Sequence, residues 1–484
     1  MAFIVRGILP WIVLLAISPA YAGTQDLPDL GDEAAAIISP HEERKLGETL
    51  MRKLRRSLRF LDDPEINDYL QILGQRLVAH SDSDRSDFQF FVIDDPTINA
   101  FALPGGFIGI NTGLILAAQS ESELAAVMAH ETAHITQRHL PRMFAESKRT
   151  SKQVMAALLA ALVLAGAGES TGSQATLALA SAGLAQKQLN FTRAHEEEAD
   201  RVGIGILAGA EFDPQAMPTV FERMQNWGRL NETNLPEFLR THPITSRRIA
   251  ESRNRAERYP YRQVPDSAQF HHIRAKLRAT GRGTPTEIVM VLKDNLDQGK
   301  YRNAAAERYG YTLALVRVKE YDAARKEMAL LLGKDPDSVT YRILEAEIEM
   351  AAGQYDKALD ILANAARKFP ANRALQRYYA TALLKTGHPQ TARELLKKAL
   401  KNHADDPALQ KMLATAAGES GARLEAHQAL ASYYHLNGNL GAAIEQLQIA
   451  KRFAGDSFYI RSSLDARIKE IQEELSAQKK GRRN

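Results

Sequence analysis

The five residues His130-Glu131-Thr132-Ala133-His134 place two histidines four positions apart, with a glutamate between them. Because an α-helix turns about 100° per residue, residues four apart lie on the same face. Two imidazoles at that spacing can bind one Zn²⁺, and the glutamate can accept a proton from the metal-bound water. The motif therefore predicts a zinc site on a helix; two surface histidines on an ordinary helix are the alternative.

The sequence around the motif supports a helix. Ser120 and Glu123 form a capping pattern before an apolar run that starts at Leu124, and Pro141 is expected to end the helix. His139 follows five residues after His134, so on a continuous helix it lies on roughly the far side from His130. We expect it to be a solvent-exposed or core histidine.

A catalytic zinc site needs a third protein ligand and an open position for water. Residues 190–200 predict a second helix, on which Glu196 and Asp200 share a face. We expect Glu196 to bind the metal and Asp200 to accept the free N–H of a ligand histidine, which orients the ring. Glu198 is a weaker alternative ligand, and His195 points away from the metal if Glu196 points towards it.

Residues 88–94 and 101–110 predict two β-strands, the second interrupted by Pro104-Gly105-Gly106. Asn99, Ala100 and Phe101 would then lie on an edge strand near the zinc. Such an edge can pair with an extended substrate backbone. A plain hairpin in a small sheet is the alternative.

Four motifs occur in a fixed order across about residues 90–250: residues 99–108, H-E-x-x-H at 130–134, E-x-x-A-D at 196–200, and His242-Pro243 followed by Arg248. In this order they resemble the gluzincin peptidases of the HtpX and CAAX-prenyl-protease type. The resemblance implies an α+β zincin-type metalloprotease domain. Over the whole chain the resemblance is to the soluble periplasmic members that carry C-terminal tetratricopeptide repeats.

The resemblance also places His242 near the metal. His242 is then a fourth zinc contact, a donor to the transition state, or a histidine packed beside Pro243. A fourth protein ligand would act as a latch, because it fills the position that water needs. Arg248 either stabilises an oxyanion or forms an ion pair with a carboxylate.

The N-terminus predicts export. Arg6 precedes an apolar run over residues 7–17, and Ala20-Tyr21-Ala22 is typical of a cleavage site, so residues 1–22 are expected to be a signal peptide. The chain has no cysteine, which excludes disulfides and thiolate chemistry. Its formal net charge of +4 gives no argument for nucleic acid.

Two small-residue, apolar runs over residues 154–168 and 175–185 lie between the two predicted zinc helices. The longer one falls short of the roughly 20 residues that span a bilayer, so no transmembrane span is expected in the mature chain. We expect a helical hairpin that packs on the domain, covers the cleft as a lid, or touches a membrane surface.

The C-terminal part carries a 34-residue repeat. The residues that keep this spacing are the glycines 353, 387 and 421, the alanines 324, 358, 392 and 426, the tyrosines 321 and 355, and the prolines 336 and 370. A helix–turn–helix unit of this length is typical of tetratricopeptide repeats, which stack into a solenoid with a concave groove. Further units are expected at Gly299 with Ala304, and at Gly438 with Ala442.

These patterns divide the chain into four parts. They are the signal peptide (1–22), the zinc metalloprotease domain (23–262), a linker with a bridging helix near residues 270–279 (263–284), and an all-α tetratricopeptide solenoid (285–484). A basic amphipathic helix is expected over residues 41–60. Residues 470–484 are expected to form a closing helix and a basic tail.

The sequence predicts an exported zinc endopeptidase. His130, His134 and Glu196 hold one Zn²⁺ per chain, and Glu131 and Asp200 serve catalysis. The resemblance implies a periplasmic location and a chaperone-like role in outer-membrane protein assembly and quality control. It also implies misfolded or stalled outer-membrane β-barrel proteins as substrates, and the β-barrel assembly machinery as a partner of the groove. The alternative is a repeat-based chaperone or adaptor whose protease domain is largely silent.

Overall fold

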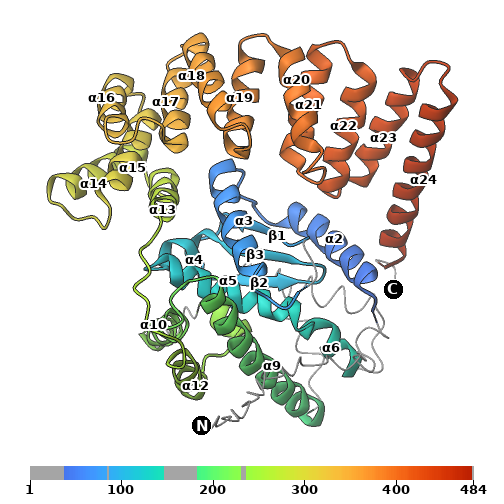
Figure 1. The fold of residues 1–484 in the computed structure, drawn as a ribbon. Coiled ribbons are helices and arrows are strands. Elements are labelled where there is room, and N and C mark those ends of the chain that lie inside the picture. The colour runs from blue at the N-terminus through green and yellow to red at the C-terminus, as the bar shows by residue number, and fades with distance from the viewer. Residues whose placement is uncertain (1–37, 84–86, 147–181, 231–235, 482–484) are drawn as a thin grey trace, which may run out of the picture.

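The computed structural model describes residues 38–83, 87–146, 182–230 and 236–481 (Figure 1). The expected signal peptide lies outside these residues, as do the run at 154–168 and most of the run at 175–185. Within the described ranges, no helix is both long enough and apolar enough to cross a membrane.

The N-terminal half, expected to be the peptidase domain, is built around a small sheet and a buried helix. The sheet has the order β1-β3-β2, from β1 (Gln89–Ile93), β2 (Ala100–Leu103) and β3 (Phe107–Asn111). β1 runs parallel to β3 and β2 runs antiparallel to it, so β2 is an edge strand. The turn from β2 to β3 uses Gly105 and Gly106, whose φ angles of 81° and 89° favour glycine.

Ten helices are described around this sheet, counting only the parts of the chain that the structure covers. They are α2 (Pro40–Ser57), α3 (Pro64–Val78), α4 (Thr112–Ala117), α5 (Glu121–Thr136), α6 (His139–Glu146), α9 (Ala182–Gly209), α10 (Ala216–Leu230), α11 (Glu237–Thr241), α12 (Ser246–Ala256) and α13 (Ala268–Thr280). Buried apolar residues follow α5 on several faces, so it is a core helix. A Cβ at Gly203 of α9 would lie 3.2 Å from the backbone nitrogen of His130. The glycine therefore lets α9 approach the motif closely.

The predicted start of α5 at Ser120 is confirmed, but its predicted end is wrong. Ser120 caps it by accepting the backbone N–H of Glu123, but the Glu123 carboxylate accepts from the Gln119 backbone and pairs with Arg223. The expected end at Pro141 is wrong, because α5 stops at Thr136. Arg138 then takes a left-handed φ of 51° and starts α6. Pro141 lies in the first turn of α6, where its missing N–H breaks no helical bond.

The C-terminal half is an array of helices that runs as an arc over the peptidase domain (Figure 1). Its helices are α14 (Pro285–Asp297), α15 (Ala304–Arg317), α16 (Tyr321–Leu332), α17 (Val339–Ala351), α18 (Tyr355–Lys368), α19 (Arg373–Lys385), α20 (Pro389–Leu400), α21 (Pro407–Glu419), α22 (Arg423–Leu436), α23 (Leu440–Arg452) and α24 (Phe458–Gly481). The closing helix starts earlier than the expected residue 470, because Leu464 and Ile468 already face the core.

The repeat spacing explains the turns and the helix contacts of the solenoid. Gly353, Gly387 and Gly421 have φ angles of 78°, 74° and 80° in the turns between helices. Lys319, one repeat length before Gly353, takes the same left-handed conformation at 65°. The alanines 324, 358 and 392 are fully buried where helices meet. In the unit after Gly438 the fully buried alanine is Ala443, rather than the expected Ala442.

α13 joins the two halves. Its Phe270, Ile273 and Leu277 belong to the peptidase core, whereas Ala275 and Ala279 belong to the first core of the solenoid. A second contact lies at the far end of the array, where Arg52 of α2 is 2.8 Å from Glu474 of α24. Between these points α19 packs on α3, where Arg377 pairs with Asp62, so the solenoid contacts the peptidase domain at several places along its length.

Candidate metal and peptidase site

Four side chains converge beside the sheet. α5 supplies His130 and His134, α9 supplies Glu196, and the segment after α11 supplies His242. Ligand-type atoms of all four lie within 4.8 Å of one another. His242 is held there by Phe238, whose ring stacks on the imidazole with centroids 4.8 Å apart.

The spacing of these atoms matches a tetrahedral metal site. Four donors at about 2.0–2.1 Å from one ion lie about 3.3–3.4 Å from each other. His130 Nε2 lies 3.1 Å from His134 Nε2 and 3.4 Å from His242 Nδ1. Glu196 Oε2 lies 3.4 Å from His130 Nε2, and Glu196 Oε1 lies 3.4 Å from His134 Nε2 and 2.9 Å from His242 Nδ1. Three imidazoles and one carboxylate therefore fit a metal in this place.

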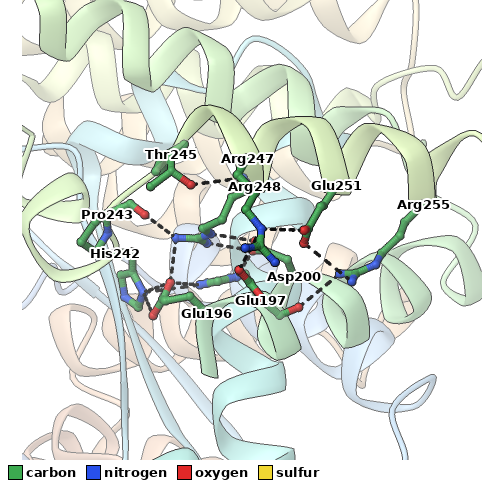
Figure 2. A network of polar contacts seen from close by, with 12 residues as sticks. Glu196, Glu197, Asp200, His242, Pro243, Thr245, Arg247, Arg248, Glu251 and Arg255 are labelled. Atoms are coloured by element: carbon green, nitrogen blue, oxygen red, sulfur yellow. Dashed lines mark hydrogen bonds and ion pairs between the residues drawn. The ribbon is translucent and has the colours of Figure 1, made fainter. Parts of the chain in front are cut away.

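A buried ion-pair network supports the cluster from behind, and Figure 2 shows Arg248 at its centre. Asp200 Oδ1 lies 3.0 Å from His130 Nδ1. Arg248 donates two hydrogen bonds of 2.8 Å to Asp200, and its Nη1 lies 3.0 Å from Glu196. Arg248 also donates to the carbonyl of Pro243, which ties the segment after His242 to the network. Thr245 places Arg248 by capping the first turn of α12.

The charges in this network fix the ionisation of the ligand groups. Burial opposes ionisation of Glu196, but the contacts with His242, His130 and His134 outweigh it and hold its pKa well below the usual value. Burial likewise opposes ionisation of Asp200, and Arg248 and His130 outweigh it, so the pKa is lowered. Both carboxylates are therefore anions, which suits a cation in the site.

Glu131 lies on α5 between the two histidines and is buried. Burial raises its pKa, which is the direction that a proton acceptor near neutral pH requires. The backbone N–H of Ala102 in β2 hydrogen-bonds to the carboxylate. Oε1 lies 3.5 Å from His242 Nε2 and has no hydrogen-bond partner in the part of the chain that the structure describes.

A cavity of about 190 Å³ opens beside Glu131, His134 and His242. Leu103, Leu140 and Met143 line its apolar part. Of the three residues predicted to lie on the edge strand, two border this cavity and one does not. Asn99 and Phe101 border this cavity, whereas Ala100 is fully buried and does not.

The remaining histidines of this region do not enter the ligand group. Glu198, the alternative ligand, lies outside it and pairs with His139 and Arg142. His195 stacks on His139 with ring centroids 4.2 Å apart. His139 is buried, and its Nδ1 lies 2.9 Å from His134 Nδ1. This contact could not be predicted from the sequence, because the left-handed turn at Arg138 invalidates helical spacing beyond residue 136.

The site and the fold together define a metallopeptidase joined to a repeat solenoid. A family model described as Peptidase family M48 matches residues 64–256, and two tetratricopeptide-repeat models match residues 312–373 and 349–416. The chain belongs to this family of metallopeptidases.

Two relatives match this chain over most of their length, and a third matches over half of its length. The chain is 36% identical over 375 residues to the beta-barrel assembly-enhancing protease of Escherichia coli strain K12, covering 77% of this chain and 76% of the relative. It is 32% identical over 470 residues to the protein of that name from Yersinia pestis, covering 95% and 96%. The mitochondrial metalloendopeptidase OMA1 of Schizosaccharomyces pombe is 35% identical over 182 residues, covering 37% of this chain and 50% of the relative.

Proposed function

We propose that this chain is a zinc endopeptidase of the periplasm, acting in the assembly and quality control of outer-membrane β-barrel proteins. The observation that carries the proposal is the cluster of His130, His134 and Glu196 around one point, with the buried carboxylate of Glu131 beside it. The name of the relatives, beta-barrel assembly-enhancing protease, supports the biological part.

Zinc is the metal that this donor set favours. Imidazole and carboxylate ligands in a four-coordinate arrangement are typical of Zn²⁺, whereas Ca²⁺ and Mg²⁺ prefer six or more oxygen ligands. We assign His130, His134 and Glu196 as the protein ligands of one zinc per chain. When bound, zinc supplies a Lewis acid that polarises the scissile carbonyl and activates a water molecule.

The chain's own residues perform the proton transfers and hold the ligands. Glu131 accepts the proton of the attacking water and delivers it to the leaving amine. Asp200 faces His130 Nδ1 and fixes the orientation of that ring. Arg248 is a positioning residue, because it holds Asp200, Glu196 and the Pro243 carbonyl together.

His242 is a latch in this proposal. Its Nδ1 lies with the ligand atoms, while its Nε2 lies 3.5 Å from Glu131 Oε1. A fourth protein ligand occupies the position that water needs, so resting activity is low until the imidazole moves. A histidine that instead donates to the transition state would have to stay in place.

The edge of β2 and the solenoid are the proposed sites for protein substrates. Ala102 directs its N–H to Glu131, so the free edge of β2 runs beside the proton acceptor. An extended substrate that pairs with this edge is brought alongside Glu131. The solenoid would bind stalled or misfolded outer-membrane proteins and the β-barrel assembly machinery, with a chaperone-like effect.

The position of His242 also favours a second function. If the latch does not open, the protein acts as a chaperone or adaptor through its repeats and its peptidase domain stays largely silent. Both functions use the same fold, and cleavage separates them.

The test compares Glu131→Gln with the wild type and with Glu197→Gln, a control on α9 that lies outside the ligand group. Zinc content and the degradation of an unfolded outer-membrane β-barrel protein are measured. We expect about one zinc per chain in all three proteins, and cleavage in all but Glu131→Gln. Equal cleavage by Glu131→Gln would disprove the assignment of the proton acceptor. Zinc without cleavage in the wild type would favour the adaptor.

A further inference from the structure

We propose that His139 is a positioning residue for His134, and that it links this ligand to Glu198 through a chain of hydrogen bonds. The inference rests on the proposed metal site, in which His134 binds through Nε2. It assigns a role to a histidine outside the ligand group, on the short helix α6.

The geometry forms a continuous path. His134 Nδ1 lies 2.9 Å from His139 Nδ1, and His139 Nε2 lies 3.2 Å from Glu198 Oε2. Arg142 donates a hydrogen bond of 2.8 Å to Glu198, and Arg201 donates one of 3.1 Å. The path therefore runs from the ligand through one imidazole to a carboxylate that two arginines hold.

The chemistry of imidazole gives this path a direction. A neutral histidine that binds a metal through Nε2 carries a hydrogen on Nδ1, and this N–H needs an acceptor that fixes the ring. The Glu198 carboxylate can only accept, so His139 donates from Nε2. Its Nδ1 is then a bare acceptor that faces the N–H of His134.

The two ligand histidines are thus supported in different ways. His130 faces the Asp200 carboxylate directly at 3.0 Å, whereas a neutral ring stands between His134 and Glu198. The ring of His139 is 3% exposed and stacks on His195 at an interplanar angle of 12°. Its plane is therefore fixed, which is what an orienting contact requires.

The test uses the full-length chain and measures the zinc dissociation constant by competition with a chelator. His139→Leu removes the acceptor at similar size, whereas His139→Asn places an amide oxygen where Nδ1 stands. We expect His139→Leu to weaken zinc binding about 10–100-fold, the usual effect of losing the partner of a ligand. His139→Asn should stay within about 3-fold of the wild type.

His195→Phe is the matched control, because it keeps a ring for the stack and should leave zinc affinity unchanged. Glu198→Leu removes the distal carboxylate and should weaken zinc binding in the same direction, which keeps the test decisive if His139→Leu does not fold. Retained zinc affinity in the Leu variant with a loss in the Asn variant would show that His139 only fills space, and would overturn the proposal. Equal losses in the two variants, or no loss in either, would overturn it as well. A wild type that binds no zinc would overturn the proposed function as well.

Discussion

The hydrophobic cores of the peptidase domain and of the solenoid are organised differently. In the peptidase domain one large core surrounds α5, with two smaller clusters beside α2, and charged groups such as Glu131, Asp200 and Arg248 are buried next to the large core. In the solenoid, four smaller apolar cores follow one another along the helices that the structure describes. A buried charge without its partner is costly, whereas each repeat contact adds a small share of stability. Single substitutions should therefore act strongly in the first half and weakly in the second.

The largest expected effect is at Glu196. Glu196→Gln removes the anionic ligand and should weaken zinc binding more than about 100-fold, the upper limit for losing a partner of a ligand. Glu198→Gln should change zinc binding less than about 10-fold, since its amide oxygen still accepts from His139. Metal analysis of both purified variants checks this pair. Loss of zinc in Glu198→Gln alone would mean that the wrong glutamate has been assigned.

The next effect concerns His242. His242→Ala should retain zinc and raise unregulated proteolysis several-fold, with self-cleavage, because the coordination position becomes free for water. The measurement is the cleavage rate of an unfolded protein together with zinc content. If cleavage disappears while zinc stays, His242 is a donor to the transition state. Unchanged cleavage would mean that His242 is simply packed beside Pro243.

The stability of the solenoid should fall step by step as packed helices are removed. Two fragments that start at different residues test this. Although the boundary was expected near residue 285, Ala275 and Ala279 of α13 belong to the first solenoid core. A fragment of residues 268–484 should therefore be more stable than one of residues 285–484. Its free energy of unfolding should be larger by about 2–5 kcal/mol, and its melting temperature should be higher. Circular dichroism on heating measures both. Equal midpoints would assign α13 to the peptidase domain alone.

The smallest effect is expected at the border between the halves. Glu347 of α17 has a buried Oε2 without a hydrogen-bond partner among the residues that the structure covers, and burial raises its pKa to about 7. The folded state therefore binds more protons than the unfolded state between about pH 4.5 and pH 7. Stability falls as the pH rises through this range.

Glu347→Gln removes this loss, so it should be more stable than the wild type by about 1–3 kcal/mol at pH 8 and nearly equal at pH 4.5. Urea unfolding at the two pH values measures the difference. Glu345→Gln, on the same helix but facing Arg342, is the control and should show no such pH dependence. The charge of Lys276 on α13 acts on Glu347 and opposes the rise of its pKa. A Glu347→Gln variant that is less stable at pH 8 would show that Lys276 needs the charge of Glu347.

The parts of the fold that were predictable are those with a local rule. Ser120 caps α5, and the glycines at 353, 387 and 421 mark turns because their backbone is left-handed. Lys319 fills the equivalent position without being glycine, so the first repeat was less visible in the sequence. α3 and α10 carry no motif. Their place follows from packing against α5 and α9, which no local pattern encodes.

Helical spacing predicts which site residues share a face of one helix, but not how residues from different helices come together. Helical spacing puts His130 and His134 on one face, and Glu196 and Asp200 on another. The grouping of His242 with them and the contacts of Arg248 depend on how α9, α11 and α12 pack, so family resemblance was needed to suggest them. The role of His139 was missed because Arg138 turns the chain between two helices.

The two-sided burial of α13 has a mechanical consequence. A hinge requires a segment that neither body holds, and α13 is held by both, with Lys276 2.6 Å from Glu65 inside the contact. A force applied to the solenoid is therefore transmitted to the peptidase domain and does not simply rotate the two halves about α13. A force on the repeats would act on α3. From α3 it would be transmitted through the hydrogen bond of Tyr69 to Glu121, which lies in the first turn of α5, the helix that carries the metal motif.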